Sequence, residues 1–577
     1  MKKYLIAQNG ESSYHITAHQ YADETIRFAA SELQKYLLRS TNAAIPYFSD
    51  RCAQRGPEIR IGAGVRGETY AETELHPDGF RIKGDGENIN ITGATSRGVL
   101  YGVYCFLERF CGFYCLTKDV EIIEKRETLE IELDEICFEP TFEFRDAYFR
   151  FAFDGGFASK NHLNSSLCDI SVARGGRMKW FNFHHSFNDL VPRSEYFAEH
   201  PEYYSEINGE RVEASQLCLT NPEVFEIAKA TLIRWIRENP ECRVFSVAQN
   251  DNRRRCTCER CMALEAEEGS PAGPIIHFVN KLADAIKDDY PDILIHTFAY
   301  QYSLPAPKHV VARDNVIVRL CSISSRFDAP FEKLALEQGS RAEEFVNAMR
   351  NWKDHASRLY VWDYTVNFSN YLVPFLHLYT LKENINFFRR MGVKGVLEQG
   401  NFAHGGGAAF DDLKSYVISR LLWNPDVDID EEVMRFSKAV YGDAAGEKMA
   451  EYAFLTIRAC ESAPLTIRNT PFDAYLTDGY ISSADRLVKE AIALADSEEH
   501  RKRVKREQLA IRFLQLVRVP EDAPNRLDMI NEFFDDVKGF GITEIKERRS
   551  IAASKQSMIE GWTNPASLNY SLYYIMQ

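Results

Sequence analysis

The sequence predicts an α/β protein built around a (β/α)8 barrel, with a small α+β domain before the barrel and a helical domain after it. Three observations predict this class. A chain of 577 residues is too long for one ordinary core. Between residues 136 and 410, apolar β-rich runs alternate with amphipathic helical stretches. Outside that range the patterns differ, so we place the domains at 1–135, 136–410 and 411–577.

The first domain mixes short alternating runs with two helical patterns, as expected for a sheet covered on one face by helices. The runs are Glu58–Ile61, Gly79–Lys83 and Asn88–Thr92, and the helical patterns are Thr25–Leu38 and Gly98–Phe110. No concentrated set of His, Cys or carboxylates occurs in it. We therefore expect a catalytically silent domain whose excess apolar surface docks on the barrel and is needed for the barrel to fold.

Eight apolar runs predict the barrel strands, and helical stretches such as Pro222–Glu238, Pro274–Asp288 and Ala342–His355 separate several of them. The runs are Phe144–Phe151, Met178–Phe183, Gln216–Leu219, Val244–Ala248, Ile293–Ala299, Val316–Cys321, Leu359–Trp362 and Val393–Leu397. In this fold the chemistry lies on the loops that follow the strands.

The third domain contains periodic apolar positions at Leu413–Leu422, Glu431–Tyr441 and Ser483–Phe513. It shows no strand pattern, no repeat of fixed period and no clustered ligands. These features predict helices with a packing role.

The charge balance excludes some partners. The chain has 69 Lys+Arg and 84 Asp+Glu, a net charge of -15, with no long basic run, which argues against nucleic acid and against anionic membranes. No window approaches the roughly 20 apolar residues of a membrane span. The apolar stretch near the start is too short for a signal peptide, so we expect a cytoplasmic protein. The oligomeric state stays open, with a homodimer as one alternative.

The residues after the predicted strands are mainly carboxylates, aromatics and amides, a mixture that suits an oligosaccharide substrate. Asp146 lies in the first strand. The expected substrate contacts are His184, His185, Asn250, Asn252, Tyr300, Trp362, Tyr364 and Asn401. For Tyr300 and Trp362 the alternative is an ordinary place in the core.

Cleavage of a glycosidic bond needs one protonated carboxyl group and a second group that stabilises or captures the oxocarbenium-like centre. Asp251 and Glu398 follow apolar strands on opposite sides of the predicted mouth, so we expect them to flank one bond. Asp363 is a third candidate. The alternative is that these acids orient a loop or pair with the arginines at 253–255.

Two further motifs suggest metal. Adjacent side chains on a strand point to opposite faces, so we expect one of His184 and His185 to face the mouth and the other to pack outside, which excludes a shared ion. Cys256, Cys258 and Cys261 form a CxCxxC motif shaped for zinc or an iron–sulfur cluster, but the fourth ligand is not local. We predict a structural zinc completed by a distant residue, with reduced thiols that pin a loop as the alternative. The other cysteines, Cys218 among them, are interpreted as small buried hydrophobes.

Several segments resemble known glycosidases. Phe28–Gln34, Ile59–Gly62, Gly79–Ile82 and Gly93–Gly102 look like the small domain that precedes the barrel in family 20 β-hexosaminidases and in α-glucuronidases. His185–Phe187, Tyr196–Pro201, Gln216–Pro222, Asn250–Asp251, the CxCxxC motif and Leu421–Pro425 look like the barrel known as domain of unknown function 4838. That group includes glycoside hydrolase family 163, whose characterised members resemble endo-β-N-acetylglucosaminidases.

The resemblance implies a retaining, substrate-assisted glycoside hydrolase that acts on β-linked N-acetylglucosamine-containing oligosaccharides and needs no cofactor for catalysis. Family 20 enzymes place an Asp-Glu pair after strand four. Here Asn252 follows Asp251, so Glu398 is the expected general acid/base and Asp251 the residue that orients the acetamido group. The alternatives are a non-catalytic carbohydrate-binding barrel, an α-glucuronidase-like hydrolase and a zinc-dependent hydrolase.

Overall fold

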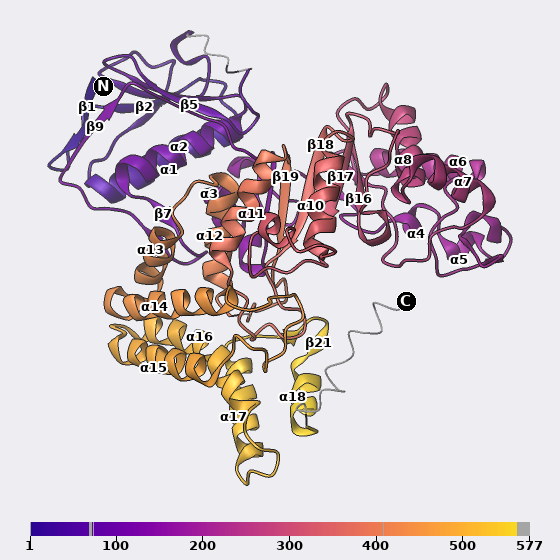
Figure 1. Cartoon of the computed structure of the whole chain (residues 1–577). Coiled ribbons are helices and arrows are strands. Elements are labelled where there is room, and N and C mark those ends of the chain that lie inside the picture. The colour runs from indigo at the N-terminus through magenta and orange to yellow at the C-terminus, as the bar shows by residue number, and fades with distance from the viewer. Residues whose placement is uncertain (1, 68–71, 73, 408, 562–577) are drawn as a thin grey trace.

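The computed structural model describes residues 2–67, 72, 74–407 and 409–561. Figure 1 shows the N-terminal sheet and its helices at one end, the barrel sheet in the centre and the C-terminal helices at the other end. None of the described helices is long and apolar enough to cross a membrane.

The N-terminal domain contains a six-stranded mixed sheet covered by two long helices. Its strands, in spatial order, are β10 (Glu135–Phe138), β5 (Phe80–Gly84), β6 (Ile89–Gly93), β4 (Glu58–Ile61), β2 (His15–Ala18) and β3 (Tyr47–Ser49). A separate antiparallel pair joins β1 (Lys2–Gln8) to β9 (Thr128–Leu133), and β7 (Tyr114–Cys115) pairs with β8 (Glu121–Ile122). Helices α1 (Glu24–Thr41) and α2 (Ser96–Cys111) lie side by side under the sheet (Figure 1). The predicted strands and helices of this domain are confirmed.

Caps define both helices. Asp23 accepts a hydrogen bond from the backbone N–H of Ile26 at the start of α1, and Thr95 accepts one from Gly98 at the start of α2. Each helix ends at a residue in the left-handed region, Asn42 and Gly112. Local chemistry therefore sets the helix ends that the sequence pattern predicts.

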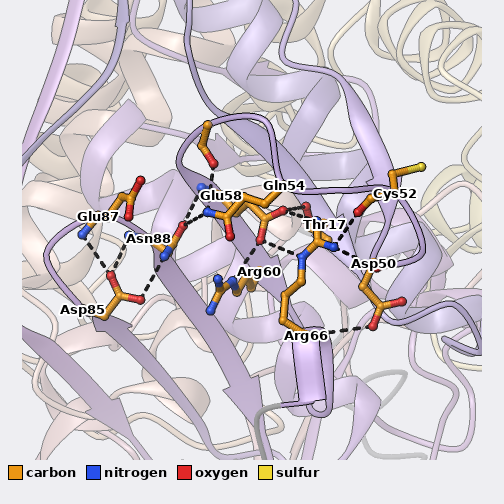
Figure 2. Close-up of polar contacts among 11 residues, drawn as sticks. Thr17, Asp50, Cys52, Gln54, Glu58, Arg60, Arg66, Asp85, Glu87 and Asn88 are labelled. Carbon is orange, nitrogen blue, oxygen red and sulfur yellow. Dashed lines mark hydrogen bonds and ion pairs between the residues drawn. The ribbon is translucent and has the colours of Figure 1, made fainter.

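A buried carboxylate organises the start of strand β4 in this sheet, as Figure 2 shows. Glu58 on β4 is 2% exposed and accepts hydrogen bonds from Thr17 Oγ1 at 3.1 Å, Arg60 Nε at 3.0 Å and Arg66 Nη2 at 2.5 Å. Burial alone would raise the pKa of Glu58, but its hydrogen bonds with the two arginines outweigh burial and lower it. Arg66 also donates to the backbone oxygen of Asp50 at 2.8 Å, which ties the next loop to β4.

A second buried carboxylate joins the N-terminal domain to the barrel. Asp78 accepts hydrogen bonds from Arg97 Nε of α2 at 2.6 Å and from Arg145 Nη2 of the first barrel strand at 2.6 Å. Trp423 packs at the same contact, with its ring 4.1 Å from that of His162 and 5.3 Å from that of Tyr101. The interface therefore combines charge pairing with aromatic stacking.

The barrel sheet is parallel, curled and seven-stranded. In spatial order its strands are β11 (Phe144–Tyr148), β19 (Gly395–Gln399), β18 (Arg358–Tyr364), β17 (Val316–Cys321), β16 (Leu294–Ala299), β15 (Val244–Ser246) and β12 (Trp180–Phe181). Seven of the eight predicted strands are thus confirmed. Among the described residues β11 and β12 do not pair, and the rings of Phe144 and Trp180, 5.3 Å apart, fill the space between them.

The predicted third strand, residues 216–219, is wrong. This segment makes only an isolated bridge between Leu217 and Tyr204. Its polar side chains instead bond to the loop after β15: Gln216 Nε2 donates to the backbone oxygens of Asn250 and Asn252 at 2.8 Å each. Its backbone bonds go to neighbouring loops, such as Cys218 N to Tyr203 O at 2.8 Å, so the segment does not join the barrel sheet.

The barrel domain contains ten helices among its described residues, of which α8 and α12 pack on the sheet. They are α3 (Gly155–Lys160), α4 (Phe187–Leu190), α5 (Arg193–Tyr196), α6 (Pro222–Glu238), α7 (Glu259–Glu268), α8 (Ala272–Ile286), α9 (Phe331–Leu334), α10 (Arg341–Trp352), α11 (Leu378–Arg390) and α12 (Asp411–Trp423). A small hairpin, β13 (Glu206–Ile207) and β14 (Glu210–Arg211), precedes α6.

The C-terminal domain consists mainly of helices. They are α13 (Ile429–Tyr441), α14 (Asp443–Cys460), α15 (Asp478–Leu494), α16 (Glu498–Leu516), α17 (Arg526–Gly539) and α18 (Ile551–Ile559). The pattern at Ser483–Phe513 forms two helices, because the chain turns before Ser497, which caps α16. The expectation of a strand-free domain is wrong, since β20 (Glu544–Lys546) pairs with β21 (Arg549–Ser550).

Candidate active site

The register of the sheet determines which side chains face the barrel interior. One apolar cluster takes a residue from each strand and forms the floor of the interior: Phe144, Trp180, Val244, Leu294, Ile317, Tyr360 and Leu397. Because side chains alternate along a strand, residues two positions further along face the same interior. Asp146, Arg319 and Trp362 lie there, with His296 on β16.

Arg319 is the most unusual residue of this interior. It is 0% exposed, and its guanidinium carbon lies 4.2 Å from the ring centre of Trp180, 4.9 Å from Phe183 and 5.4 Å from Trp362. None of its side-chain nitrogens has a hydrogen-bond partner within the described chain. Burial lowers the pKa of Arg319 to about 10. The barrel therefore holds a desolvated cation whose neighbours are aromatic faces.

Asp146 faces the same interior from β11. Burial raises its pKa to about 7, against the opposing effects of the Ser165 hydroxyl and the Arg319 charge. Asp146 and Arg319 make no ion pair with each other in the described part of the chain. The side chain of each can therefore still form hydrogen bonds with a polar group of a ligand.

Asp251 lies at the mouth, on the loop after β15, and its side chain is 52% exposed. Tyr300 donates its hydroxyl to Asp251 Oδ1 at 3.2 Å, and His185 Nε2 lies 3.9 Å from the same oxygen. His185 Nδ1 is 2.6 Å from the backbone oxygen of Gln249. A carbonyl only accepts, so Nδ1 carries the proton and Nε2 faces Asp251. The Tyr300 hydroxyl thus orients an accessible carboxylate, and the His185 ring lies beside it.

The prediction that His184 and His185 point to opposite faces is wrong. Both lie beyond β12, where strand alternation no longer applies, and their rings are nearly parallel with centres 6.0 Å apart. Burial and the neighbouring His185 lower the pKa of His184. The pair forms one side of the mouth, and no group of metal-binding geometry among the described residues includes either histidine.

Asn250 and Asn252 shape the wall beside the mouth. Asn250 accepts from the backbone N–H of Asn188 at 3.1 Å and donates to the backbone oxygen of Ser215 at 2.9 Å, whereas Asn252 Oδ1 accepts from Gln216 at 3.1 Å. The two asparagines line a cavity of about 220 Å³, together with Asn188, Arg193, Tyr204, Glu213, Ser215 and Leu217. Gln216, which sequence reasoning missed as a site residue, holds this wall.

The predicted aromatic contacts Trp362 and Tyr364 lie two positions apart on β18. Trp362 donates Nε1–H to Gln399 Oε1 at 2.8 Å, and both side chains face the interior. Tyr364 faces the same way and is buried, with its pKa raised by that burial. Asn401 is buried and bonds the backbone N–H of Ala403 at 3.0 Å, so it shapes the following loop.

Glu398 and Asp363 do not lie where the sequence placed them. They are register partners on β19 and β18, between interior residues, so both face outward from the barrel, and both are 0% exposed. Ser322 donates its hydroxyl to Asp363. Burial raises the pKa of Asp363 to about 7, and burial followed by the Asp363 charge raises that of Glu398 well above its usual value. The expectation that Glu398 and Asp251 flank one bond at the mouth is therefore not met by this placement.

A second carboxyl group, which the sequence did not suggest, comes from the C-terminal hairpin and lies close enough to Asp251 for their charges to interact. The hairpin β20–β21 is held to the barrel loops by hydrogen bonds from Tyr371 N to Ile545 O at 2.8 Å and from Thr543 Oγ1 to His404 O at 2.6 Å. Its turn carries Glu547, whose pKa is raised by burial and, among other charges, by that of Asp251. Glu547 in turn contributes to the raised pKa of Tyr148, after burial and Asp146. The C-terminal domain thus brings a second carboxyl group to the site.

The cysteine motif acquires its fourth member from the segment predicted as strand three. The sulfurs of Cys218, Cys256, Cys258 and Cys261 lie within 4.8 Å of one another, and all four residues are buried. The interpretation of Cys218 as an ordinary apolar residue is wrong, because the cluster contains these four cysteines and no other apolar residue of the described chain.

A family model described as domain of unknown function (DUF4838) matches residues 115–453, more than half of the chain. The chain belongs to the DUF4838 family. The N-terminal part of this DUF4838 protein, residues 6–106, matches the model described as the glycosyl hydrolase family 67 N-terminus. The predicted resemblance to the DUF4838 barrel is confirmed. No protein with curated annotation matches.

Solved structures share the architecture of the DUF4838 chain at low identity. BtGH115A, a family GH115 4-O-methyl-α-glucuronidase with specificity for decorated arabinogalactans, is 9% identical with a TM-score of 0.57, over 94% of this chain and 76% of that chain. The GH20 β-N-acetylhexosaminidase from Streptomyces coelicolor A3(2) is 13% identical with a TM-score of 0.43, over 78% and 93%. The Flavobacterium johnsoniae chitobiase is 10% identical with a TM-score of 0.45, over 97% and 94%. The first of these supports the barrel fold.

Proposed function

We propose that the protein is a retaining glycoside hydrolase that acts on β-linked N-acetylglucosamine-containing oligosaccharides. The observation that carries the proposal is the meeting of two different carboxyl groups at the barrel mouth. Asp251 is accessible and held by a hydrogen bond from Tyr300, whereas burial favours the protonated form of Glu547. Two carboxyls whose environments differ in this way suit one acid and one charged partner.

In the proposed mechanism Glu547 is the general acid. It donates its proton to the glycosidic oxygen as the bond from that oxygen to the anomeric carbon breaks. Asp251 accepts the acetamido N–H of the substrate, and the acetamido oxygen forms the new bond to the anomeric carbon. Water then opens this intermediate, with Glu547 acting as base. Tyr300 keeps Asp251 in one orientation through its hydroxyl hydrogen bond.

Glu398 is the alternative acid that the sequence favoured. Its protonated state suits the role, but a substrate in the mouth meets the opposite face of β19. We therefore assign the role to Glu547 and use Glu398 as the comparison in the test.

A specific observation favours a second candidate, an α-glucuronidase-like hydrolase. Arg319 lacks any hydrogen-bond partner in the described chain and sits below the mouth, where a guanidinium could bind the carboxylate of a uronic acid bidentately. The match of residues 6–106 to the family 67 N-terminus and the fold shared with a GH115 α-glucuronidase agree with this candidate.

The test is a hydrolysis screen with β-N-acetylglucosaminides, chito-oligosaccharides and α-glucuronides, next to a binding array of the same glycans. On the preferred β-N-acetylglucosaminide we expect Asp251→Asn and Glu547→Gln to lose about two to four orders of magnitude in kcat/KM, while Glu398→Gln stays close to wild type. Loss in Glu398→Gln with an active Glu547→Gln variant would reverse the assignment. Turnover of glucuronides alone selects the second candidate, and binding without turnover refutes the hydrolase.

A further inference from the structure

Four cysteines from two distant segments converge below the wall of the mouth. Cys218 precedes α6, whereas Cys256, Cys258 and Cys261 lie on the loop after β15 and in the first turn of α7. Cys218 Sγ is 3.7 Å from Cys258 Sγ and 3.9 Å from Cys261 Sγ. A zinc ion with four sulfurs at about 2.3 Å requires sulfur–sulfur distances of about 3.8 Å. The spacing therefore fits the edges of a zinc tetrahedron.

Neither a disulfide nor apolar packing accounts for the cluster as well as a metal does. A disulfide needs its sulfurs about 2.05 Å apart, much closer than the two distances above. Cysteines that serve as small hydrophobes pack among aliphatic and aromatic side chains. This cluster contains only the four cysteines.

The surroundings are suited to thiolates. The backbone N–H of Glu206 points at Cys256 Sγ at 3.4 Å, Arg211 Nη1 lies 3.9 Å from the same sulfur, and the Thr220 hydroxyl lies 3.2 Å from Cys261 Sγ. Hydrogen-bond donors and a positive charge around sulfur stabilise the negative charge of a metal tetrathiolate. Three elements thus supply an outer shell to the cluster.

We propose that Cys218, Cys256, Cys258 and Cys261 bind one zinc ion as thiolates and that this ion fixes the loop that carries Asp251. Each thiol gives up its proton to solvent as its sulfur coordinates the metal. With four protein ligands the ion has no open position for a substrate or water, which makes the site structural. The ion links the 216–218 segment to the loop after β15, beside the contacts of Gln216 with Asn250 and Asn252.

The inference does not depend on the substrate, because metal content is measured without activity. We expect elemental analysis of the purified full chain to give about one zinc per chain, and Cys218→Ser to lose most of it. Cys242→Ser is the matched control, since Cys242 is a buried cysteine of the same domain outside the cluster. It should keep its zinc. Absence of zinc from the wild type, iron in its place, or a Cys218→Ser variant that retains zinc would overturn the proposal.

Two measurements on the wild type remain decisive if Cys218→Ser fails to fold. Replacement of zinc by cobalt should give the intense thiolate charge-transfer absorption of a tetrahedral sulfur site. Hydrogen exchange should rise in residues 215–219 and 250–261 after chelation, with little change in α15 and α16. Unchanged exchange in the two segments after metal loss would refute the fixing role.

Discussion

Replacing Asp78 by Asn should destabilise the protein strongly, because this carboxylate compensates two guanidinium charges at the junction of two domains. Arg145 is 0% exposed and Arg97 is largely buried, and each donates to Asp78 at 2.6 Å. Removing one partner of a buried pair costs about 3–5 kcal/mol, since the remaining charge stays desolvated. We expect a loss of this size in the free energy of unfolding.

Urea denaturation followed by tryptophan fluorescence measures this loss, and Trp423 at the interface reports on the separation of the domains. Glu132→Gln is the matched control, because Glu132 pairs with Lys3 at 3.8 Å on the exposed surface. Such pairs contribute about 0–1 kcal/mol. If Asp78→Asn unfolds at the same urea concentration as the control, the interface does not depend on this charge.

A chain that begins at Glu139 tests the same interface. It should be insoluble or melt well below the full chain, and full activity without residues 1–138 would refute the docking role.

The pH dependence of the Asp78→Asn effect has a defined sign. Burial would raise the pKa of Asp78, but the charges of Arg97 and Arg145 outweigh burial and hold it well below its ordinary value of 3.8. A lowered pKa in the folded state contributes stability that is complete above the unfolded pKa and is lost as the pH falls. The difference between wild type and variant should therefore be constant from pH 5 to 8 and shrink below about pH 4, by up to about 1.4 kcal/mol per pH unit. A difference that stays constant down to pH 3 would contradict this account.

Three further predictions concern buried acids. The charge of Asp251 helps to keep Glu547 protonated. In Asp251→Asn the residual kcat/KM should therefore fall on the alkaline side at a lower pH than in wild type. An alkaline fall at the same pH as in wild type would mean that Glu547 is not the titrating acid. The pKa of Glu398 is raised, so its stabilising contribution is present at low pH and lost as the pH rises. Thermal melts should therefore show Glu398→Gln equal to wild type below about pH 4 and more stable than wild type at about pH 9, and the opposite order would refute the buried neutral state. Glu58→Gln leaves Arg66 without its charged partner (Figure 2) and should lower the free energy of unfolding by about 3–5 kcal/mol in urea; a loss below about 1 kcal/mol would mark the pair as unimportant.

Periodicity predicted most of the strands and helices, but not that residues 216–219 lie outside the barrel sheet. Residues 216–219 read as a strand because Leu217, Cys218 and Leu219 form a short apolar run. In the structure Gln216 and Cys218 bond to a loop more than 30 residues away. Such partners are fixed by tertiary contacts, and a local pattern carries no information on them.

The lack of tertiary information in a local pattern also explains why Glu398 was expected at the mouth. Strands of a parallel barrel are buried on both faces and read as continuous apolar runs, so residues 393–397 did not indicate which face Glu398 would occupy. A shift of one position exchanges the two faces. Only the register of β19 with β11 and β18, seen in the structure, places Leu397 inside and Glu398 outside.

Glu547 illustrates a site residue that no local signal could reveal. It lies in a run of charged residues, Lys546 to Arg549, which on the sequence alone resembles a solvated surface. Its place at the mouth results from backbone bonds to Tyr371 and His404, roughly 140 to 175 positions earlier in the chain. Since those bonds hold a turn rather than a core element, the C-terminal domain can supply an acid to a barrel that already has its floor and its Asp251. If the proposed mechanism holds, a chain that ends before the hairpin should therefore still fold its barrel yet lose the general acid.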